Sequence, residues 1–234
     1  MGTHDRLNQT RIALRQERLD SILVSSSNNR RYLSGFTGSA GYLVITESDA
    51  ILATDFRYIE QAGQQAPDFT VHRIGGAADW LPKLSSHLGV QRMGFEAQDM
   101  TVSVHAALVK ANREADVRTR LRLVKTYDLI DRLRAKKYPE ELQLLQHAIT
   151  IADQAMDEVA PTIEQGMTEK LIASHLEMAM RKRGAENVSF DTIVGAGPNG
   201  ALPHHRADDT VIERNQAIVI DMGCIYEGYC SDLT

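Results

Sequence analysis

Residues 217–234, AIVIDMGCIYEGYCSDLT, decide the fold of the second half of the chain. An apolar run leads to Asp221, a short polar reversal follows, and a second aspartate, Asp232, comes eleven positions later. A strand, a reversal and a second strand predict a β-hairpin. With a two-residue loop at 226–227, the two aspartates lie directly opposite each other. With the loop at 227–228 they are diagonal neighbours on the same face.

Two carboxylates held this close need a compensating charge. Beside apolar residues the repulsion between Asp221 and Asp232 increases, because a low dielectric strengthens it. A shared proton would relieve it, and so would divalent cations, which bridging carboxylates hold in two-metal hydrolases. Oxygen ligands suit Mn²⁺, Mg²⁺ or Ca²⁺, and Zn²⁺ or Co²⁺ when a histidine joins them. The alternative is two solvated turn residues without chemistry.

A second group of candidate residues lies in a loop rich in glycine and proline. The stretch GAGPNGALPHHRADD, residues 195–209, places His204 and His205 after an apolar strand. Loops that follow strands commonly carry catalytic side chains. An imidazole donates a hydrogen bond to a carbonyl oxygen or transfers a proton near neutral pH. Adjacent residues of an extended chain point in opposite directions, so we expect only one of the two to face a site. A surface location for the pair is the alternative.

The composition argues against several classes of protein. The 234 residues carry a net charge of −5 and a pI of about 5.9, which disfavours binding to nucleic-acid phosphates. The N-terminal segment is too polar for a signal peptide, and no apolar run approaches the ~20 residues of a membrane span. The two cysteines, Cys224 and Cys230, make neither a disulfide framework nor a zinc site. We therefore expect two small strand residues in a reduced, cytoplasmic protein that binds neither nucleic acid nor membrane.

Short apolar runs alternate with amphipathic stretches in the first half of the chain. The runs expected to form strands are SILVSS, GYLVIT, AILAT, FTVHRI and RMGFEA. This alternation predicts a layered α/β domain that ends near residues 120–135. The glycines of SGFTGSAG are expected to make tight turns. Asp55 and Arg57 are expected to form a local ion pair or an interface contact.

A helical pattern begins after this domain. Tyr138-Pro139 predicts a helix start, because proline suits the first turn and the residue before it is extended. Thr168 is expected to cap a second helix and Gly184 to end it. In the first helix, apolar residues recur at steps of three and four and predict one apolar face. Its members are Leu142, Leu145, Ile149, Ala152, Met156 and Val159.

The motifs around the aspartates and histidines resemble those of a known family. FDTIVGAGPNGALPHHR, residues 190–206, followed by IVIDMGCIYEGYCSDLT, residues 218–234, is similar to the Xaa-Pro aminopeptidase and prolidase family of metallopeptidases. That family has the pita-bread fold of methionine aminopeptidase and creatinase. The resemblance implies a metallopeptidase that hydrolyses the bond between an N-terminal residue and a following proline.

Segments of the first half carry the same resemblance. Residues 28–46 and 51–62 resemble the N-terminal domain of creatinase, prolidases and aminopeptidases P, and residues 136–153 resemble the family's junction helix. The implied fold class is α/β, with a creatinase-like N-terminal domain around a mixed sheet at residues 1–130. The first half of a pita-bread α+β domain follows at residues 131–234. Family members commonly use the first domain for dimer contacts, so a homodimer is expected.

Residue by residue, the resemblance assigns three site residues. Asp221 corresponds to the first aspartate ligand of a dinuclear metal centre, and Asp232 to the aspartate that bridges both ions. His204 corresponds to the histidine that lies beside the metals and contacts substrate, whereas no role carries over to His205. The implied cofactors are two divalent ions, Mn²⁺ first and Co²⁺ or Zn²⁺ as alternatives, which activate a water molecule for attack. The implied partner is a proline-containing peptide.

The sequence also departs from the family pattern. The family completes its centre with a further histidine and two glutamates downstream of the second aspartate, and this chain ends at Thr234. Two carboxylates do not supply the roughly six ligands of a hard divalent ion. We therefore expect a fragment that is catalytically inactive and binds no metal firmly. Asp232 is expected near a frayed chain end, and the apolar helix face is expected to stay uncovered, which favours association.

Two alternatives to a metallopeptidase remain at this stage. Some pita-bread proteins lack catalysis and bind protein partners, but a binding module does not require two opposed acids. A creatinase-type hydrolase works without metal, and the presence of both Asp221 and Asp232 argues against it. Hydrolysis of Xaa-Pro peptides in the presence of Mn²⁺, Co²⁺ or Zn²⁺ would favour the metallopeptidase over these two hypotheses.

Overall fold

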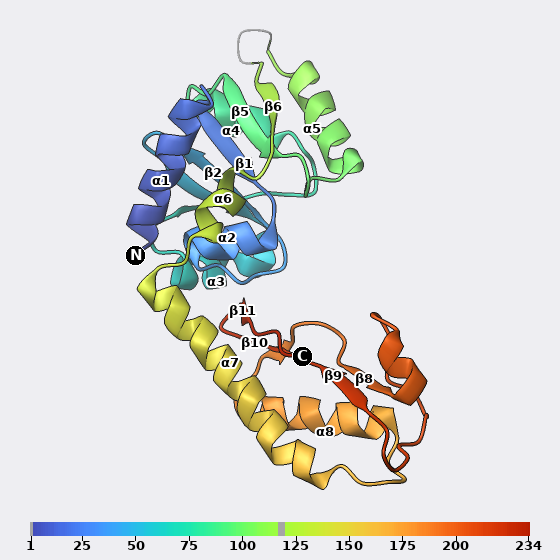
Figure 1. Ribbon diagram of the computed structural model, residues 1–234. Coiled ribbons are helices and arrows are strands. Elements are labelled where there is room, and N and C mark those ends of the chain that lie inside the picture. Colours follow the sequence, from blue (N-terminus) through green and yellow to red (C-terminus); the bar gives the residue numbers. More distant parts are fainter. Residues whose placement is uncertain (1, 117–119) are drawn as a thin grey trace. The chain divides into compact units, whose positions relative to one another are not determined.

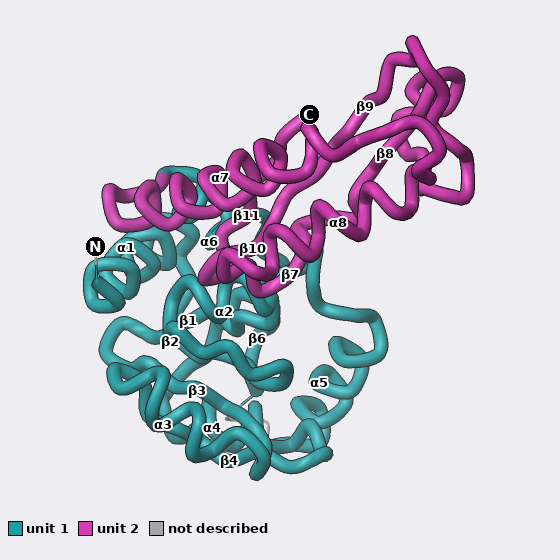
Figure 2. Tube along the Cα trace, turned by 90° about the horizontal axis from the view of Figure 1, so that it is seen from below, with its two compact units in different colours: residues 1–136 teal, residues 137–234 magenta. Residues whose placement is uncertain are grey.

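The computed structural model describes residues 2–116 and 120–234, which form two compact units, residues 1–136 and 137–234 (Figure 2). In chain order the elements of the first unit are α1 (Thr3–Gln16), β1 (Ser21–Val24), α2 (Ser27–Ser34), β2 (Tyr42–Thr46), β3 (Ala50–Thr54), η1 (Phe56–Tyr58), α3 (Ile59–Gln65), β4 (Thr70–Arg73), α4 (Trp80–His87), β5 (Arg92–Glu96), α5 (Val102–Glu114), β6 (Arg122–Thr126) and α6 (Leu129–Ala135). The boundary expected at residues 130/131 falls inside α6, whose contacts with α1 and α2 place it in the first unit.

The strands of the first unit form one mixed sheet in the order β4-β3-β2-β1-β5-β6 (Figure 1). β2 runs antiparallel to β1 and β3, whereas β1 with β5, β5 with β6, and β3 with β4 are parallel. Two parallel strands must be joined by a crossover connection, which is usually a helix. The crossover helices of this unit cover both faces of the sheet. The predicted α/β domain with a mixed sheet is thereby confirmed.

Alternate residues of the central strand pack against different helices. Ile22 and Val24 belong to a core cluster with α1, α2, α3 and α6, whereas Leu23 belongs to a second cluster with α4 and α5. Because successive strand residues point to opposite faces, the apolar run of β1 fills two cores at once. The unit is therefore a three-layer sandwich, with the sheet between two groups of helices.

The two local features expected in this unit are present. Arg57 donates from Nε and Nη2 to the two carboxylate oxygens of Asp55, at 2.9 and 2.8 Å. Gly35 ends α2 with φ of 79°, a left-handed conformation that glycine adopts without strain. Both features are local structure, as predicted.

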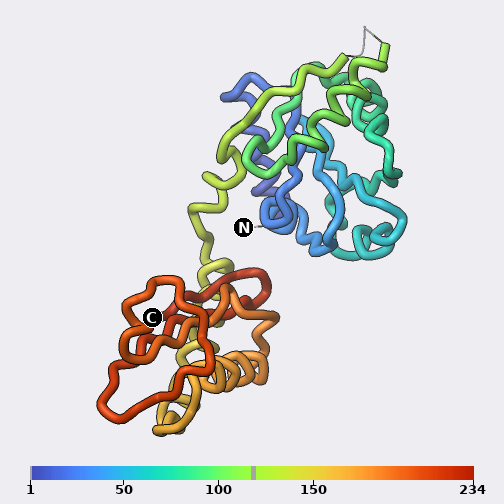
Figure 3. Tube along the Cα trace, turned by 90° about the vertical axis from the view of Figure 1, so that its right-hand side faces the viewer, coloured from blue at the N-terminus to red at the C-terminus, as the bar shows by residue number. Residues whose placement is uncertain are grey.

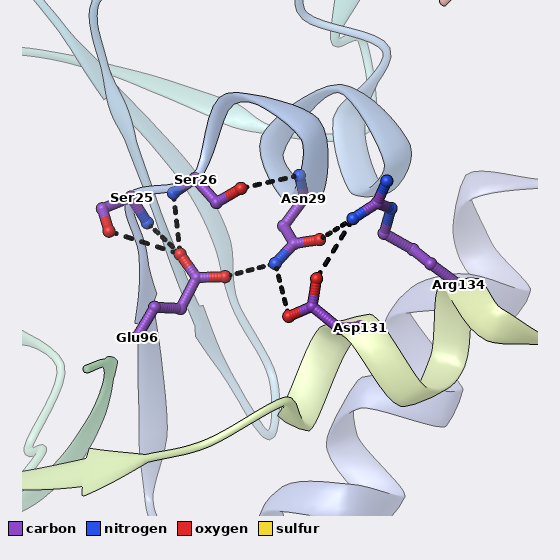
Figure 4. Close-up of polar contacts among 6 residues, drawn as sticks. All are labelled: Ser25, Ser26, Asn29, Glu96, Asp131 and Arg134. Atoms are coloured by element: carbon purple, nitrogen blue, oxygen red, sulfur yellow. Dashed lines mark hydrogen bonds and ion pairs between the residues drawn. The ribbon is translucent and has the colours of Figure 1, made fainter. Parts of the chain in front are cut away.

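A buried carboxylate organises the start of α2 (Figure 4). Glu96, the last residue of β5, accepts hydrogen bonds through Oε2 from the backbone N–H groups of Ser25 and Ser26, at 2.6 and 2.7 Å. Its Oε1 accepts from Asn29 Nδ2 at 2.6 Å. A carboxylate at a helix N-terminus satisfies unpaired N–H groups and opposes the helix dipole. Glu96 thus joins the central sheet to α2.

The same network continues into α6. Asn29 donates from Nδ2 to Asp131 at 3.2 Å and accepts at Oδ1 from Arg134 Nη1 at 2.9 Å. Arg134 also pairs with Asp131 at 3.1 Å. Figure 4 shows Asn29 between the two groups, so its amide connects α2, β5 and α6 through a single side chain.

The second unit has two long helices and short strands. In chain order its elements are α7 (Pro139–Val159), η3 (Ala160–Thr162), α8 (Glu169–Lys182), β7 (Asn187–Val188), β8 (Ile193–Ala196), η4 (Gly197–Ala201), β9 (Ile218–Asp221), β10 (Cys224–Tyr226) and β11 (Tyr229–Cys230). β8 pairs with β9, and β10 lies between β11 and β7. Pro139 begins α7, Thr168 Oγ1 accepts from Leu171 N at 3.2 Å, and Gly184 has φ of 99° after α8, so the three expected helix signals are confirmed.

The apolar face expected for α7 is largely uncovered, as was expected, and a different stripe of the helix is buried. Of the six expected residues, only Ala152 and Val159 are buried, while Leu142 and Ile149 are 54% and 41% exposed. The buried residues of this helix are Glu141, Ala148, Ile151, Ala152, Ala155 and Val159. Alanines on this stripe let α7 approach α8 and β10 closely, since they bring no long side chain into the contact. Figure 2 shows α7 and α8 side by side.

Candidate metal and catalytic site

The two aspartates lie on neighbouring parts of the second unit. Asp221 is the last residue of β9 and pairs with Ile193 of β8. Asp232 follows β11, which forms an antiparallel hairpin with β10. The predicted hairpin is therefore present, and Cys224 and Cys230 are free thiols in its strands, as expected.

The register of this hairpin is the second of the two that were considered, and the first is wrong. Tyr226 pairs with Tyr229, so the loop consists of Glu227 and Gly228. These two residues have φ of 45° and 79°, and a type I′ turn requires positive φ at both central positions. The two aspartates are therefore diagonal neighbours, for which Cβ separations of about 7–8 Å are typical, rather than directly opposed residues.

Asp232 lies in a docked segment, in contrast to the fraying that was expected. The backbones of Met222 and Leu233 exchange two hydrogen bonds of 2.9 Å, and Ser231 N donates to Cys224 O at 2.9 Å. These bonds flank Asp232 on both sides while its side chain remains exposed. The backbone at this position is thereby held in the hairpin.

Asp221 has an unpartnered carboxylate oxygen. Within the described residues, its Oδ1 is buried and has no hydrogen-bond donor. A buried acceptor without a partner costs free energy, and a cation would offset that cost. Carboxylate oxygens suit hard or borderline divalent ions. The residues present therefore fit part of a metal site, with Asp221 and Asp232 as oxygen ligands.

The loop between β8 and β9 carries both histidines, and Figure 3 shows it as a long excursion coloured orange to red. His204 is exposed, whereas the side chain of His205 is only 9% exposed. His205 Nε2 lies 2.6 Å from Oε2 of Glu169, the first residue of α8. The two neighbouring histidines thus have different surroundings, and only His204 is available to a ligand in solution.

Glu169 is the buried anchor of this loop. Its side chain is fully buried and accepts from Ala196 N at 2.8 Å, from Asn199 Nδ2 at 3.0 Å and from Asp208 N at 3.3 Å, besides His205. Burial works to raise the pKa of Glu169, but these hydrogen bonds outweigh it and hold the pKa below its ordinary value. The carboxylate is therefore held in its charged form.

Neither Glu169 as a site residue nor a role for His205 was predicted from the sequence. The only local signal at Glu169 is its place after Thr168, the residue expected to cap α8. The pairing with His205 spans 36 positions. No periodicity or spacing rule connects residues so far apart, which is why this contact was not predicted.

Glu169, His205 and Asp208 lie close enough to be considered as metal ligands. A carboxylate offers about four lone-pair positions. Each oxygen of Glu169 already accepts two hydrogen bonds, so no lone pair is left for an ion. This cluster is therefore a hydrogen-bonded anchor, and the metal-binding candidates remain Asp221 and Asp232.

Comparison with known proteins gives matches to both units. The family model for the Creatinase/Prolidase N-terminal domain matches residues 6–136, and the model for metallopeptidase family M24 matches residues 143–234. An uncharacterized peptidase of Bacillus subtilis, YqhT, is 36% identical over 98% of this chain and 64% of its own length. No helix in the described part of the chain is long and apolar enough to cross a membrane.

Solved structures agree with these matches. An Xaa-Pro dipeptidase from Bacillus anthracis has a TM-score of 0.92 and 36% identity, covering 99% of this chain and 63% of its own. An X-Pro aminopeptidase from Thermotoga maritima has a TM-score of 0.84 and 35% identity, covering 97% of this chain and 63% of its own. The chain thus spans less than two thirds of the length of each relative. It belongs to the creatinase/prolidase family, and its second unit is the first part of a family M24 pita-bread domain.

Proposed function

We propose that the protein is an Xaa-Pro metallopeptidase and that this chain supplies Asp221, Asp232 and His204 to its active site. The substrate is a peptide with proline after its N-terminal residue, and the reaction is hydrolysis of the bond between them. The observation that carries the proposal is the buried, unpartnered Oδ1 of Asp221, at the end of the strand that leads into the hairpin followed by Asp232. The names of the solved relatives, an Xaa-Pro dipeptidase and an X-Pro aminopeptidase, support the substrate class.

Each residue has a defined role in this proposal. Asp221 and Asp232 would hold two divalent ions together with the further ligands, with Mn²⁺ favoured and Co²⁺ or Zn²⁺ as alternatives. When bound, such ions act as Lewis acids and lower the pKa of water. His204, exposed at the edge of its loop, donates a hydrogen bond to the substrate carbonyl oxygen, where negative charge develops during hydrolysis.

The proposal includes an incomplete ligand set. Two carboxylates fall short of the ligands that a pair of divalent ions requires. The remaining ligands, one histidine and two glutamates in the family pattern, are supplied by further residues of the whole protein. We accordingly propose that these 234 residues alone bind metal weakly and show no turnover. The whole protein is proposed to be a cytoplasmic homodimer that does not bind nucleic acid.

Calorimetric titration with MnCl₂ tests the metal ligands. We expect weak binding, with a dissociation constant above about 100 μM, that is lost in Asp221→Asn and retained in Asp209→Asn, a matched change at an exposed aspartate. Binding that is equal in all three proteins would overturn the assignment of Asp221. Micromolar binding of two Mn²⁺ ions per chain, or turnover of an Ala-Pro peptide, would overturn the incomplete ligand set.

Peptide binding tests the substrate class separately. The ring resonances of His204 in a ¹H–¹⁵N spectrum are expected to shift when Ala-Pro is added with the diamagnetic ion Zn²⁺, and not when Ala-Ala is added. His204→Asn serves to assign the resonances. An equal response to both dipeptides would contradict a preference for proline.

A further inference from the structure

The loop that carries His204 is held at its middle by one pair of side chains. Glu169 and His205 meet at 2.6 Å, with 0% and 9% of their side chains exposed. An ionised carboxylate only accepts hydrogen bonds, so His205 must donate from Nε2. The pair therefore selects the tautomer of His205 that carries its proton on Nε2.

Backbone bonds hold the loop at its two ends and just beyond this pair. Gly197 N, at its start, donates to Ala217 O, at its end, at 3.0 Å. Three residues after His205, Lys170 N donates to Asp208 O at 3.0 Å. The backbone near His204 has fewer anchors: His205 N donates to Leu202 O at 3.1 Å, within the same turn. The contact with Glu169 is thus the side-chain tie that joins this turn to α8.

The inward direction of His205 fixes the outward direction of its neighbour. His205 points toward the buried carboxylate, and His204, the preceding residue, is exposed. Rotation of the turn that exposed His205 would move His204 from its present direction. It would also leave the buried, charged carboxylate of Glu169 with one hydrogen bond fewer, which is unfavourable.

We propose that Glu169 and His205 are positioning residues for His204, acting through the turn at 202–205. The proposal rests on the proposed function only for the identity of His204 as the residue that contacts substrate. Neither Glu169 nor His205 touches substrate or metal in this assignment. Their role is to keep the His204 imidazole in one direction, so that little ordering is needed when a ligand binds.

The first test measures the tautomer of His205 and the opening of the turn, with no metal or peptide present. Long-range ¹H–¹⁵N spectra of the chain are expected to show His205 with its proton on Nε2, and Glu169→Gln is expected to change that pattern. Trypsin cleavage after Arg206, whose side chain is 87% exposed, reports opening of the turn. His205→Ala is expected to increase the rate of this cleavage at least about tenfold, because the tie to α8 is lost. Cleavage after Arg214, outside the turn, serves as the internal control.

The second test separates positioning from general stability. His205→Gln keeps an N–H donor, so cleavage after Arg206 is expected to be as slow as in the unmodified chain. In His205→Ala, which has no such donor, cleavage is expected to be fast. With MnCl₂ present, paramagnetic broadening of the His204 ring is expected to fall in His205→Ala while the affinity for Mn²⁺ stays unchanged. A purely structural role would alter affinity and broadening together.

Defined outcomes would overturn the proposal. One is a proton on Nδ1 rather than Nε2 of His205 in the unmodified chain, which remains measurable even if His205→Ala does not fold. Another is an unchanged Arg206 cleavage rate in a folded His205→Ala chain. Absence of metal or peptide binding would count against the proposed function, but it would leave the tautomer and cleavage results to decide this inference.

Discussion

Asp232 lies opposite Gly223 in the C-terminal hairpin. The backbone-bonded pairs on either side, Met222 with Leu233 and Cys224 with Ser231, set this register. A Cβ added at residue 223 would lie 2.1 Å from the carbonyl oxygen of Ser231, closer than real Cβ atoms approach. The missing side chain at 223 therefore allows the strand that carries Asp232 to pack against its neighbour.

Replacing Gly223 with alanine should displace this strand. We expect Gly223→Ala to lower the free energy of unfolding by about 2–3 kcal/mol, because the backbone of Ser231 must move to relieve the clash. Urea denaturation measures the change. Gly63→Ala is the control, since a Cβ there meets nothing within 4 Å and alanine favours the helix by about 0.5–1 kcal/mol. Equal stability of the two variants would show that the hairpin tolerates a side chain at 223.

Removing the charge of Asp221 should stabilise the metal-free chain and remove the stabilisation that metal provides. Asp221→Asn is expected to raise the free energy of unfolding of the metal-free chain by up to about 1 kcal/mol, because the buried Oδ1 has no hydrogen-bond donor and an uncharged amide costs less to bury there. It should also abolish the increase in melting temperature that MnCl₂ produces in the unmodified chain. Thermal unfolding with and without MnCl₂ measures both effects. A metal-dependent increase of the same size in Asp221→Asn would show that the ion binds elsewhere.

The stability contributed by Glu169 should depend on pH. Its loop hydrogen bonds overcome the effect of burial and lower its pKa below the ordinary value of 4.5. A carboxylate whose pKa is lowered by folding adds stability that is complete above its unfolded pKa and lost as the pH falls through the folded value. The difference in free energy of unfolding between the unmodified chain and Glu169→Gln should therefore be constant near neutral pH and shrink below about pH 4.5. A difference that grows on acidification would contradict the lowered pKa.

The amide of Asn29 should be important for the stability of the first unit. Asn29→Ala removes the donor to the buried carboxylate of Glu96 and the acceptor for Arg134. We expect a loss of about 2–3 kcal/mol in the free energy of unfolding, because the buried carboxylate of Glu96 loses a hydrogen-bond donor and the partly exposed Arg134 loses an acceptor. Asn28→Ala, at an exposed position of the same helix, should change it by less than about 0.5 kcal/mol. Chemical denaturation of both variants compares the two positions.

The layers of the first unit were predictable because their signals are local. β1, β2 and β3 are short apolar runs, and each has a neighbouring strand on both sides in the sheet. A strand buried on both faces needs apolar residues at every position, so such runs indicate its place without further context. The order of the strands is set by the crossovers and was not predicted from the sequence; the family resemblance implied only that the sheet is mixed.

The face of α7 was not predictable from hydrophobicity alone. Leucine and isoleucine mark one stripe, which includes the exposed Leu142 and Ile149, while the smaller Ala148 and Ala155 mark the stripe that is buried. Hydrophobic periodicity favours the larger residues, but close packing of two helices and a sheet favours the smaller ones. The buried stripe also contains Ile151 and Val159, so hydrophobicity alone does not tell the two stripes apart.

The candidate site was predictable in its residue types and only partly in its geometry. Both hairpin registers keep the two aspartates on one face, and the conformation of Glu227 and Gly228 selects between them. The contact of Glu169 with His205 depends on how β8 leaves the sheet and on where α8 begins. Such contacts arise from tertiary structure and leave no pattern in the local sequence.

The strand order of the first unit also has a consequence for folding during synthesis. β1 pairs with β2, whose first residue comes about twenty positions later, and with β5, which comes about seventy positions later. As the chain leaves the ribosome, the antiparallel meander of β1, β2 and β3 is complete long before β5 exists. Until then the other edge of β1, Ser21–Val24, is an unpaired template for any extended segment nearby. β1, which is buried at all four positions, is thus also the inner strand whose second edge stays open longest in the nascent protein.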